Sequence, residues 1–338
     1  MRMLLDTNVW SHLSRQGLGE EFYRLIKRRS INVVTAPAAL LELLRTPQDP
    51  LRRESVRLIG RSRWTRLPTE AESEVRELVA EVARLRKGWL LPEPLRGRYA
   101  ALASDWRHGI WRAARRDDAS VIDYANRHAV EARAGISQHQ REQSARWRDE
   151  GFLRGLADAA ARLDGAVGFP RPEDETWFQS QGWRPGTHVE AWRLEALQHI
   201  HRGLFMAKRP YAEPTTGSAY ADWFETYVDL DAVSAKRAEF GELLLYEMAA
   251  SAIPRAWMRW ALGLVQHAVK ISSGNAVDAQ LSTYLYDADL FLTSDKRFQK
   301  LLESIYPKSP RPFAVPAYLN PAGNLCSEIE ELMEDTVR

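Results

Sequence analysis

Two short apolar runs that each end at a carboxylate decide the fold: Met3-Leu4-Leu5-Asp6-Thr7-Asn8 and Leu290-Phe291-Leu292-Thr293-Ser294-Asp295. A run of three or four apolar residues bounded by polar ones is typical of a buried strand. In open α/β sheets, functional sites form beyond the carboxyl ends of the strands. Asp6 and Asp295 are therefore placed where a site is expected, although the two runs are far apart in the chain.

The sequence around each run alternates between strand and helix patterns. Residues 1–47 contain two strand-like runs separated by helical stretches, and residues 266–320 return to the same alternation, with a last edge strand expected at 312–315. Neither part alone is long enough for a sheet domain. We therefore predict a single α/β domain formed by both parts and interrupted between them, because the entropic cost of closing a loop grows slowly with its length.

The middle of the chain has a different character. Residues 48–265 are rich in Ala, Arg, Glu and Leu and show almost no strand signal; the helical stretches include 70–86, 98–116, 120–133, 138–163, 189–205 and 232–253. This composition predicts a large all-helical insertion. The tail at 321–338 is acidic, and we expect it to form a surface helix.

Composition excludes several classes of protein. The 338 residues have a formal net charge of +2, so any argument for nucleic-acid binding must be local. The single cysteine, Cys326, excludes an internal disulfide framework and a cysteine-rich zinc site. No apolar run approaches the ~18 residues of a transmembrane helix, and the N-terminal residues do not resemble a signal peptide. We expect a soluble cytoplasmic protein with no membrane partner.

Four carboxylates stand where the two parts of the α/β domain would meet: Asp6, Glu42, Asp278 and Asp295. Each has a structural explanation. Asp6 and Asp295 are good N-caps for the helices that follow them. Asp278 stands three residues after Asn275, as in a capping box, and the face of Glu42 could be solvated. These explanations account for each residue singly but not for the recurrence of carboxylates at one place.

Hydrolysis of phosphodiester bonds with a divalent cation is the chemistry that needs such a cluster. Mg²⁺ and Mn²⁺ prefer oxygen ligands, and they offset the repulsion between carboxylates held close together. A bound cation lowers the pKa of its water and stabilises the charge that develops on phosphate, so no protein nucleophile is required.

Four stretches, taken in order, resemble the motifs of the PIN-domain nucleases; they are 4–8, 37–43, 275–282 and 292–298. The family includes ribonuclease toxins of bacterial toxin–antitoxin pairs, RNA-processing nucleases and structure-specific nucleases. The resemblance implies a parallel sheet flanked by helices, with an acidic site that binds Mg²⁺ or Mn²⁺ and cleaves RNA, less often DNA.

The resemblance also implies roles for individual residues. Asp6 and Asp278 would be the principal metal ligands, Glu42 a ligand or a water-positioning group, and Asp295 would complete the site. Asn8 and Ser294 would support it. The departure from the family is the long segment between the second and third motifs, 235 residues from Glu42 to Asp278, where the small toxins have a short connection. A simple toxin is therefore disfavoured.

Basic residues in the insertion suggest how substrate would be held. Six arginines lie between Arg52 and Arg66, and eleven lie between Arg96 and Arg148, often beside tryptophans (Trp64, Trp106, Trp111 and Trp147). Arginines neutralise phosphates and aromatic rings stack on unpaired bases, so Arg52, Arg53 and Arg57 are candidate nucleic-acid contacts. The alternative is that the tryptophans fill a helical core and the arginines cover its outside.

The sequence thus predicts a metal-dependent nuclease, with RNA favoured as substrate. A nuclease acting on structured or single-stranded DNA and a non-catalytic scaffold that binds RNA or protein are the alternatives. A protein regulator and a homo-oligomer both remain open. His199-Ile200-His201 does not have the spacing of a zinc motif, and Asp287 and Asp289 are expected to be exposed rather than ligands.

Overall fold

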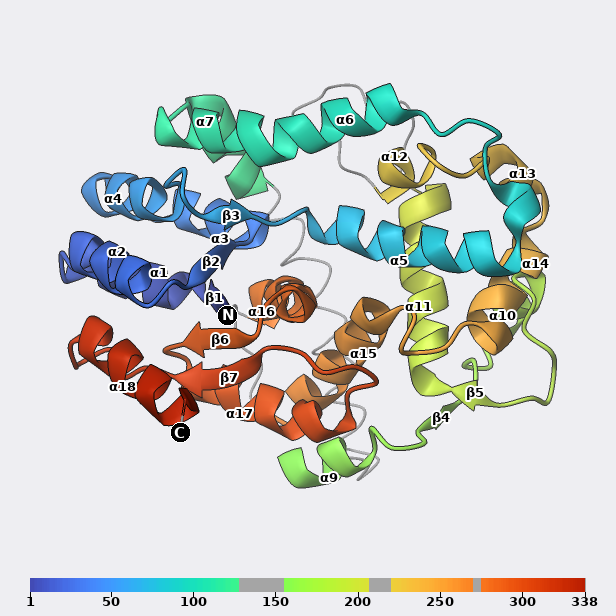
Figure 1. The fold of residues 1–338 in the computed structure, drawn as a ribbon. Helices are drawn as coiled ribbons and strands as arrows, with labels where there is room; N and C mark the ends of the chain where they lie inside the picture. The colour runs from blue at the N-terminus through green and yellow to red at the C-terminus, as the bar shows by residue number, and fades with distance from the viewer. Residues whose placement is uncertain (128–154, 207–219, 270–274, 338) are drawn as a thin grey trace.

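A five-stranded parallel sheet forms the centre of the protein, for which a computed structural model describes residues 1–127, 155–206, 220–269 and 275–337. The strand order is β3-β2-β1-β6-β7, and Figure 1 shows the five strands following one another from top to bottom. Their bounds are β1 Arg2–Leu5, β2 Asn32–Thr35, β3 Thr65–Arg66, β6 Leu290–Thr293 and β7 Val315–Tyr318. All neighbouring strands pair in parallel.

The pairing joins the two distant parts of the chain directly. β1 lies between β2 and β6, with Leu4 opposite Val34 on one side and opposite Phe291 on the other. These strands are apolar because they are buried on both faces; Leu4, Val34 and Phe291 are fully buried. The prediction of an α/β fold whose sheet takes strands from both parts is confirmed.

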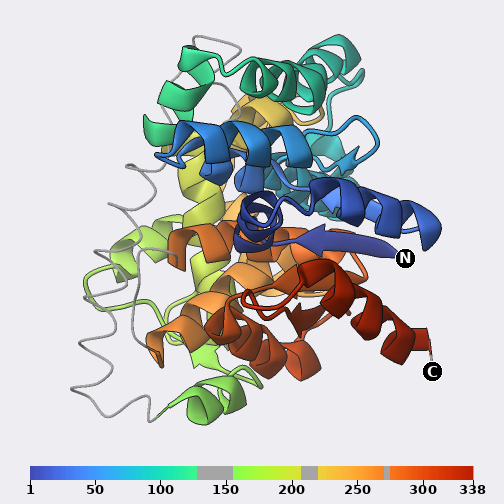
Figure 2. The ribbon, with the colours of Figure 1, turned by 90° about the vertical axis from the view of Figure 1, so that its left-hand side faces the viewer.

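Helices lie on both sides of this sheet. Figure 1 shows α1 (Thr7–Arg15), α2 (Gly19–Arg28) and α18 (Leu325–Val337) to its left, and α15 (Pro254–His267) and α16 (Asn275–Ser282) to its right. α3 (Pro37–Leu44) begins with a proline at its first position and packs on α16, and α4 (Asp49–Ile59) packs on α1 and α3. Figure 2 shows β1 running from the N-terminus towards α1.

The middle of the chain is largely helical but not entirely so. Its helices include α5 (Glu70–Leu85), α6 (Arg96–Ser104), α7 (Ile110–Arg115), α9 (Leu156–Ala161), α10 (Glu175–Ser180), α11 (Ala191–His201), α12 (Tyr220–Phe224), α13 (Leu230–Ala235) and α14 (Arg237–Glu242). β3 extends the central sheet, and β4 (Val167–Gly168) pairs with β5 (Val189–Glu190) in a short ribbon. The prediction of an all-helical segment was therefore wrong at these strands, each only two residues long and thus without a periodic signal.

Three further expectations need correction. The stretch at 232–253 is two short helices and a π-helical segment, because Lys236 leaves the helical conformation between them. The stretch at 98–116 is divided by a π-helical segment at Asp105–Gly109. The edge strand begins at Val315 rather than at 312. The predicted helix at 120–133 is helical over residues 120–127, and its remainder lies outside the described residues, as does most of the predicted helix at 138–163.

The tail forms the expected helix, and the structure shows what holds it. α18 packs on α2, where Arg28 and Arg29 pair with Glu330 and Arg29 also pairs with Glu334. Its apolar side faces inward, since Ile329 is fully buried. No helix in the described ranges is both long and apolar enough to span a bilayer.

Candidate acidic site

Asp6 lies at the carboxyl end of the central strand and is the N-cap of α1. Its Oδ1 accepts the backbone N–H of Thr7 at 2.6 Å, as expected of a capping carboxylate. Its Oδ2 accepts two further hydrogen bonds, from the Thr293 hydroxyl at 2.6 Å and from Asn8 Nδ2 at 2.7 Å. The capping interpretation is therefore confirmed, but a cap needs only the first of these bonds. The other two fix the orientation of the carboxylate.

Thr293 connects Asp6 to Asp295, and the sequence analysis missed it. Its side chain is fully buried at the last position of β6. While its hydroxyl donates to Asp6, it also accepts the backbone N–H of Asp295 at 3.0 Å. A hydroxyl at the last position of an otherwise apolar strand, beside two carboxylates, was the signal that could have identified it.

Asp295 is the N-cap of α17 (Lys296–Ile305). Its Oδ1 accepts the backbone N–H groups of Arg297 at 2.8 Å and Phe298 at 3.0 Å. Asn8 contributes to the same region, because its Oδ1 accepts the backbone N–H of Ser294 at 3.0 Å. The Ser294 hydroxyl has no hydrogen-bond partner, so Ser294 supports the site through its backbone and not through its side chain.

Asp278 and Glu42 come from two helices that pack on each other beside the sheet. Asp278 lies in the first turn of α16, and Glu42 lies in α3. The Asp278 side chain is 15% exposed, and its Oδ2 is 3.6 Å from the Arg297 guanidinium. The capping-box interpretation of Asp278 depends on the Asn275 side chain, which lies outside the described part.

The four carboxylates act on one another electrostatically. Burial, followed by the charges of Glu42 and Asp295, raises the pKa of Asp6 from 3.8 to about 7, against the lowering effect of its hydrogen bonds. Burial also raises the pKa of Asp278 well above its ordinary value, and the charges of Asp6, Asp295 and Glu42 raise it further while Arg297 lowers it. Burial is the largest cause of both shifts, and the other carboxylates of the group add to it.

The carboxylates do not form a closed ligand set. Among residues in the described ranges, no three or more His, Cys, Asp or Glu side chains are arranged to hold a metal ion. The donor chemistry nevertheless suits a hard cation, since the cluster offers only carboxylate oxygens and repels itself without a counter-charge.

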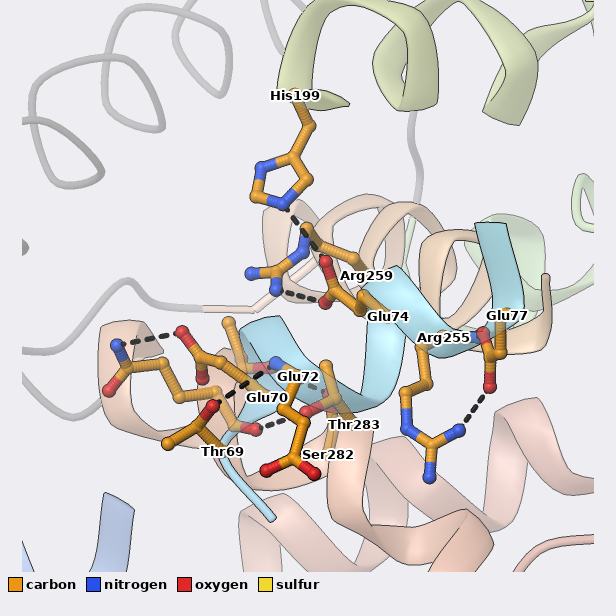
Figure 3. A network of polar contacts seen from close by, with 12 residues as sticks. Thr69, Glu70, Glu72, Glu74, Glu77, His199, Arg255, Arg259, Ser282 and Thr283 are labelled. Atoms are coloured by element: carbon orange, nitrogen blue, oxygen red, sulfur yellow. Dashed lines mark hydrogen bonds and ion pairs between the residues drawn. The ribbon is translucent and has the colours of Figure 1, made fainter. Parts of the chain in front are cut away.

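A second acidic group lies on α5, next to the site. Thr69 caps this helix by accepting the N–H of Glu72 at 3.1 Å, and Glu70 Oε1 accepts a hydrogen bond from Gln280 of α16 at 3.4 Å. Figure 3 shows Glu70 on α5 beside Ser282 and Thr283. α5 therefore contacts the helix that bears Asp278, two residues from that carboxylate.

Two further glutamates of α5, Glu74 and Glu77, pair with cations from later helices (Figure 3). Glu74 pairs with Arg259 of α15 and lies 3.1 Å from His199 of α11, while Glu77 pairs with Arg255. Burial would raise the pKa of Glu74, but the charges of Arg259 and His199 outweigh burial and lower it to about 2. The cations thus compensate Glu74, whereas burial raises the pKa of Glu77 to about 7 in spite of its pair with Arg255.

The candidate nucleic-acid contacts on α4 are already paired with acids. The Arg52 side chain is only 11% exposed and pairs with Asp49 at 2.6 Å and with Asp117 at 3.2 Å. Arg53 also pairs with Asp117, at 2.8 Å, and Arg57 pairs with Glu54 at 2.7 Å. Arg57 is the most exposed of the three, with 73% of its side chain accessible.

The tryptophans beside the arginines fill the interior. Trp64, Trp106 and Trp111 are at most 4% exposed, which excludes base stacking by these three rings in this conformation and favours the core interpretation. Trp147 lies outside the described residues. Cys326 is a buried free thiol, and burial raises its pKa to about 12.

Asp287 and Asp289 are not part of the site, as expected, but both have structural bonds. Asp287 pairs with Arg255 at 2.7 Å, and Asp289 accepts the backbone N–H of Arg2 at 2.7 Å. His201 is buried against Trp177 and belongs to no group of three or more metal-binding side chains among the described residues.

Comparison with known proteins gives no information on function, which is therefore inferred from the fold and the site. No protein-family model, no curated protein and no solved structure matches the chain.

Proposed function

We propose that this chain is a metal-dependent nuclease with a PIN-like α/β domain, and that the segment between the second and third motifs is an insertion into that domain. The observation that supports the proposal best is the assembly at one sheet edge of carboxylates from four separate elements, β1, α3, α16 and the end of β6. β1 pairs with β6, and α3 packs on α16, although the members of each pair lie far apart in the sequence. A set of N-caps would not require the four to influence one another.

Asp6, Glu42, Asp278 and Asp295 would hold the cation, Mg²⁺ or Mn²⁺. When bound, it would supply hydroxide at neutral pH and offset the charge that develops on phosphate. The chain's own residues position the carboxylates: Thr293 and Asn8 orient Asp6, and the first turn of α17 orients Asp295. Asp6 has its pKa raised to about 7, so binding of a cation at neutral pH would release a proton.

RNA is the first substrate to test, because the motifs resemble a family that cleaves RNA more often than DNA. We also propose a cytoplasmic location, from the composition of the chain, and a protein regulator or a role as a toxin, from the same resemblance.

A non-catalytic scaffold is the second candidate. It is favoured by one observation, that the carboxylates in the described part do not form a closed metal site. A cluster of buried, repelling carboxylates costs stability, however, and a scaffold has no use for that cost.

The test is incubation of the protein with total RNA and, separately, with single-stranded DNA, in the presence of Mn²⁺ or of EDTA. Asp278→Asn should abolish cleavage, whereas Asp289→Asn should retain it, because Asp289 lies at the opposite, amino-terminal edge of the sheet, where it accepts the backbone N–H of Arg2. Cleavage by the Asp278→Asn protein at the wild-type rate would contradict the site assignment. Absence of cleavage in every arm, with no effect of Mn²⁺ on the melting temperature, would favour the scaffold.

A further inference from the structure

A group of arginines that makes no ion pair within the described ranges lies on α7, one helix away from the paired arginines of α4. Arg112 and Arg115 belong to α7 and Arg116 is its C-cap. All three are exposed. Positions three and four apart share one face of a helix, so the three guanidinium groups project from the same side.

Arg66 of β3 adds a fourth cation to this face. Its guanidinium lies 5.2 Å from the ring centre of Trp111, and its Nη1 donates to the Arg107 carbonyl at 2.5 Å. Burial lowers the pKa of Arg66, and the charge of Arg115 lowers it further, which places the two like charges near each other. Like charges held together without a counter-ion favour an anionic partner.

The acids nearby are already engaged. Asp117 pairs with Arg52 and Arg53, and the Asp118 carboxylate accepts both the N–H and the hydroxyl of Ser120. The charge of Arg116 contributes to lowering the pKa of Asp118, so Arg116 is the one member of the group with an acidic neighbour. Within the described ranges, Arg66, Arg112, Arg115 and Arg116 make no ion pair of their own.

This face is close enough to the acidic site for one ligand to reach both. α7 packs on α4, and α4 packs on α3, which bears Glu42 (Figure 1). Two helix-to-helix spacings amount to about 20 Å. At roughly 3.4 Å per stacked nucleotide, this distance corresponds to about six nucleotides of a single strand.

We propose that Arg66, Arg112, Arg115 and Arg116 form a binding surface for the phosphate backbone of single-stranded nucleic acid, about six nucleotides from the point of cleavage. The inference rests on the proposed function for its choice of ligand, and it replaces the α4 arginines with the α7 arginines as the main phosphate contacts. Guanidinium groups bind phosphate through paired N–H donors, and the four arginines offer such donors without breaking an ion pair to any residue that the structure describes.

The test measures binding of a fluorescein-labelled 20-nucleotide single-stranded RNA by anisotropy, in EDTA, over a range of salt concentrations; a DNA strand of the same sequence is the second arm. The variant Arg112→Gln/Arg115→Gln/Arg116→Gln removes three charges and leaves Arg66 on Trp111. Each lost phosphate contact flattens the slope of log K against log salt by ~0.7, so the expected change is about 2, with roughly 100-fold weaker binding at 0.1 M salt.

The matched control is Arg84→Gln/Arg171→Gln/Arg184→Gln, which removes three exposed arginines that pair with Glu81, Glu173 and Glu242. It should bind within about twofold of wild type. Equal loss in both triple variants, or unchanged binding by the α7 variant with a native melting temperature, would overturn the proposal. Because binding is measured without metal, loss of RNA binding in the α7 variant would support the surface even if Mn²⁺ produced no cleavage, and cleavage with unaltered binding would refute the surface alone.

Discussion

The raised pKa of Asp6 predicts how the metal-free protein responds to pH. A carboxyl whose pKa is 3.8 when unfolded and about 7 when folded binds its proton more tightly in the folded state. Below pH 3.8 the Asp6 carboxyl makes no difference to the free energy of unfolding. Between pH 3.8 and pH 7 it lowers this free energy increasingly, and above pH 7 its contribution is constant. The full effect corresponds to ~4 kcal/mol, of which ~3 kcal/mol falls between pH 5 and pH 8.

Asp6→Asn removes this titration, and the assay is thermal unfolding in EDTA at pH 5 and at pH 8. The wild type should lose about 5 °C more than the variant between the two pH values, at roughly 2 °C per kcal/mol for a chain of this size. Any cost of the altered hydrogen bonds to Thr7, Thr293 and Asn8 is the same at both pH values and cancels in the comparison. Parallel pH profiles for the two proteins would show that neither burial nor the neighbouring carboxylates raise the pKa of Asp6, and the electrostatic support for a shared site would fail.

Three further outcomes are expected. Saturation with Mn²⁺ at 100 times Kd should stabilise the wild type by ~2.7 kcal/mol in thermal unfolding, and Asp278→Asn should abolish the shift while keeping the far-UV spectrum. Thr293→Val should destabilise the protein by ~1–3 kcal/mol and lower cleavage about 10- to 100-fold, with recovery in Thr293→Ser; full activity of the valine variant would refute the positioning role. Glu74, with its pKa lowered to about 2, should contribute stability above pH 4.5 that is lost as the pH falls towards 2, and Arg259→Met should flatten this acid transition in denaturant titrations.

The sequence predicted the sheet because apolar runs have local signatures. Met3, Leu4 and Leu5 form an uninterrupted apolar run, and a strand buried on both faces requires one. The carboxylates at the strand ends were equally visible, since an acid directly after an apolar run needs no knowledge of the remainder of the chain. β3 was not predicted, because its two residues are too few to show a period. Its place in the sheet depends on pairing with Val34 and Thr35.

Other features could not be read from the sequence because their partners lie far away in the chain. The glutamates of α5 have the pattern of a solvated helix, yet Glu72 is 1% exposed and Glu74 is 4% exposed. Their burial is tolerated because Arg107, Arg259 and His199 supply charge and hydrogen bonds from three other helical segments. The spacing of polar and apolar residues along α5 gives no information about partners from distant parts of the chain.

The arginines of α4, which pair with acids, and those of α7, which do not pair with any described acid, can be told apart only in the structure. Arg52 and Arg112 are equivalent in sequence, each lying in a basic helical stretch. In the structure, Asp117 neutralises Arg52, while Arg112 has no acid in reach within the described ranges. An arginine that must first leave a 3.2 Å ion pair gains less from a phosphate than one that exchanges only water. The charge counted along the sequence therefore overestimates the positive charge available to phosphate wherever acids from other segments pair with the arginines. For this protein, the sequence places the phosphate contacts on α4, whereas the structure favours α7.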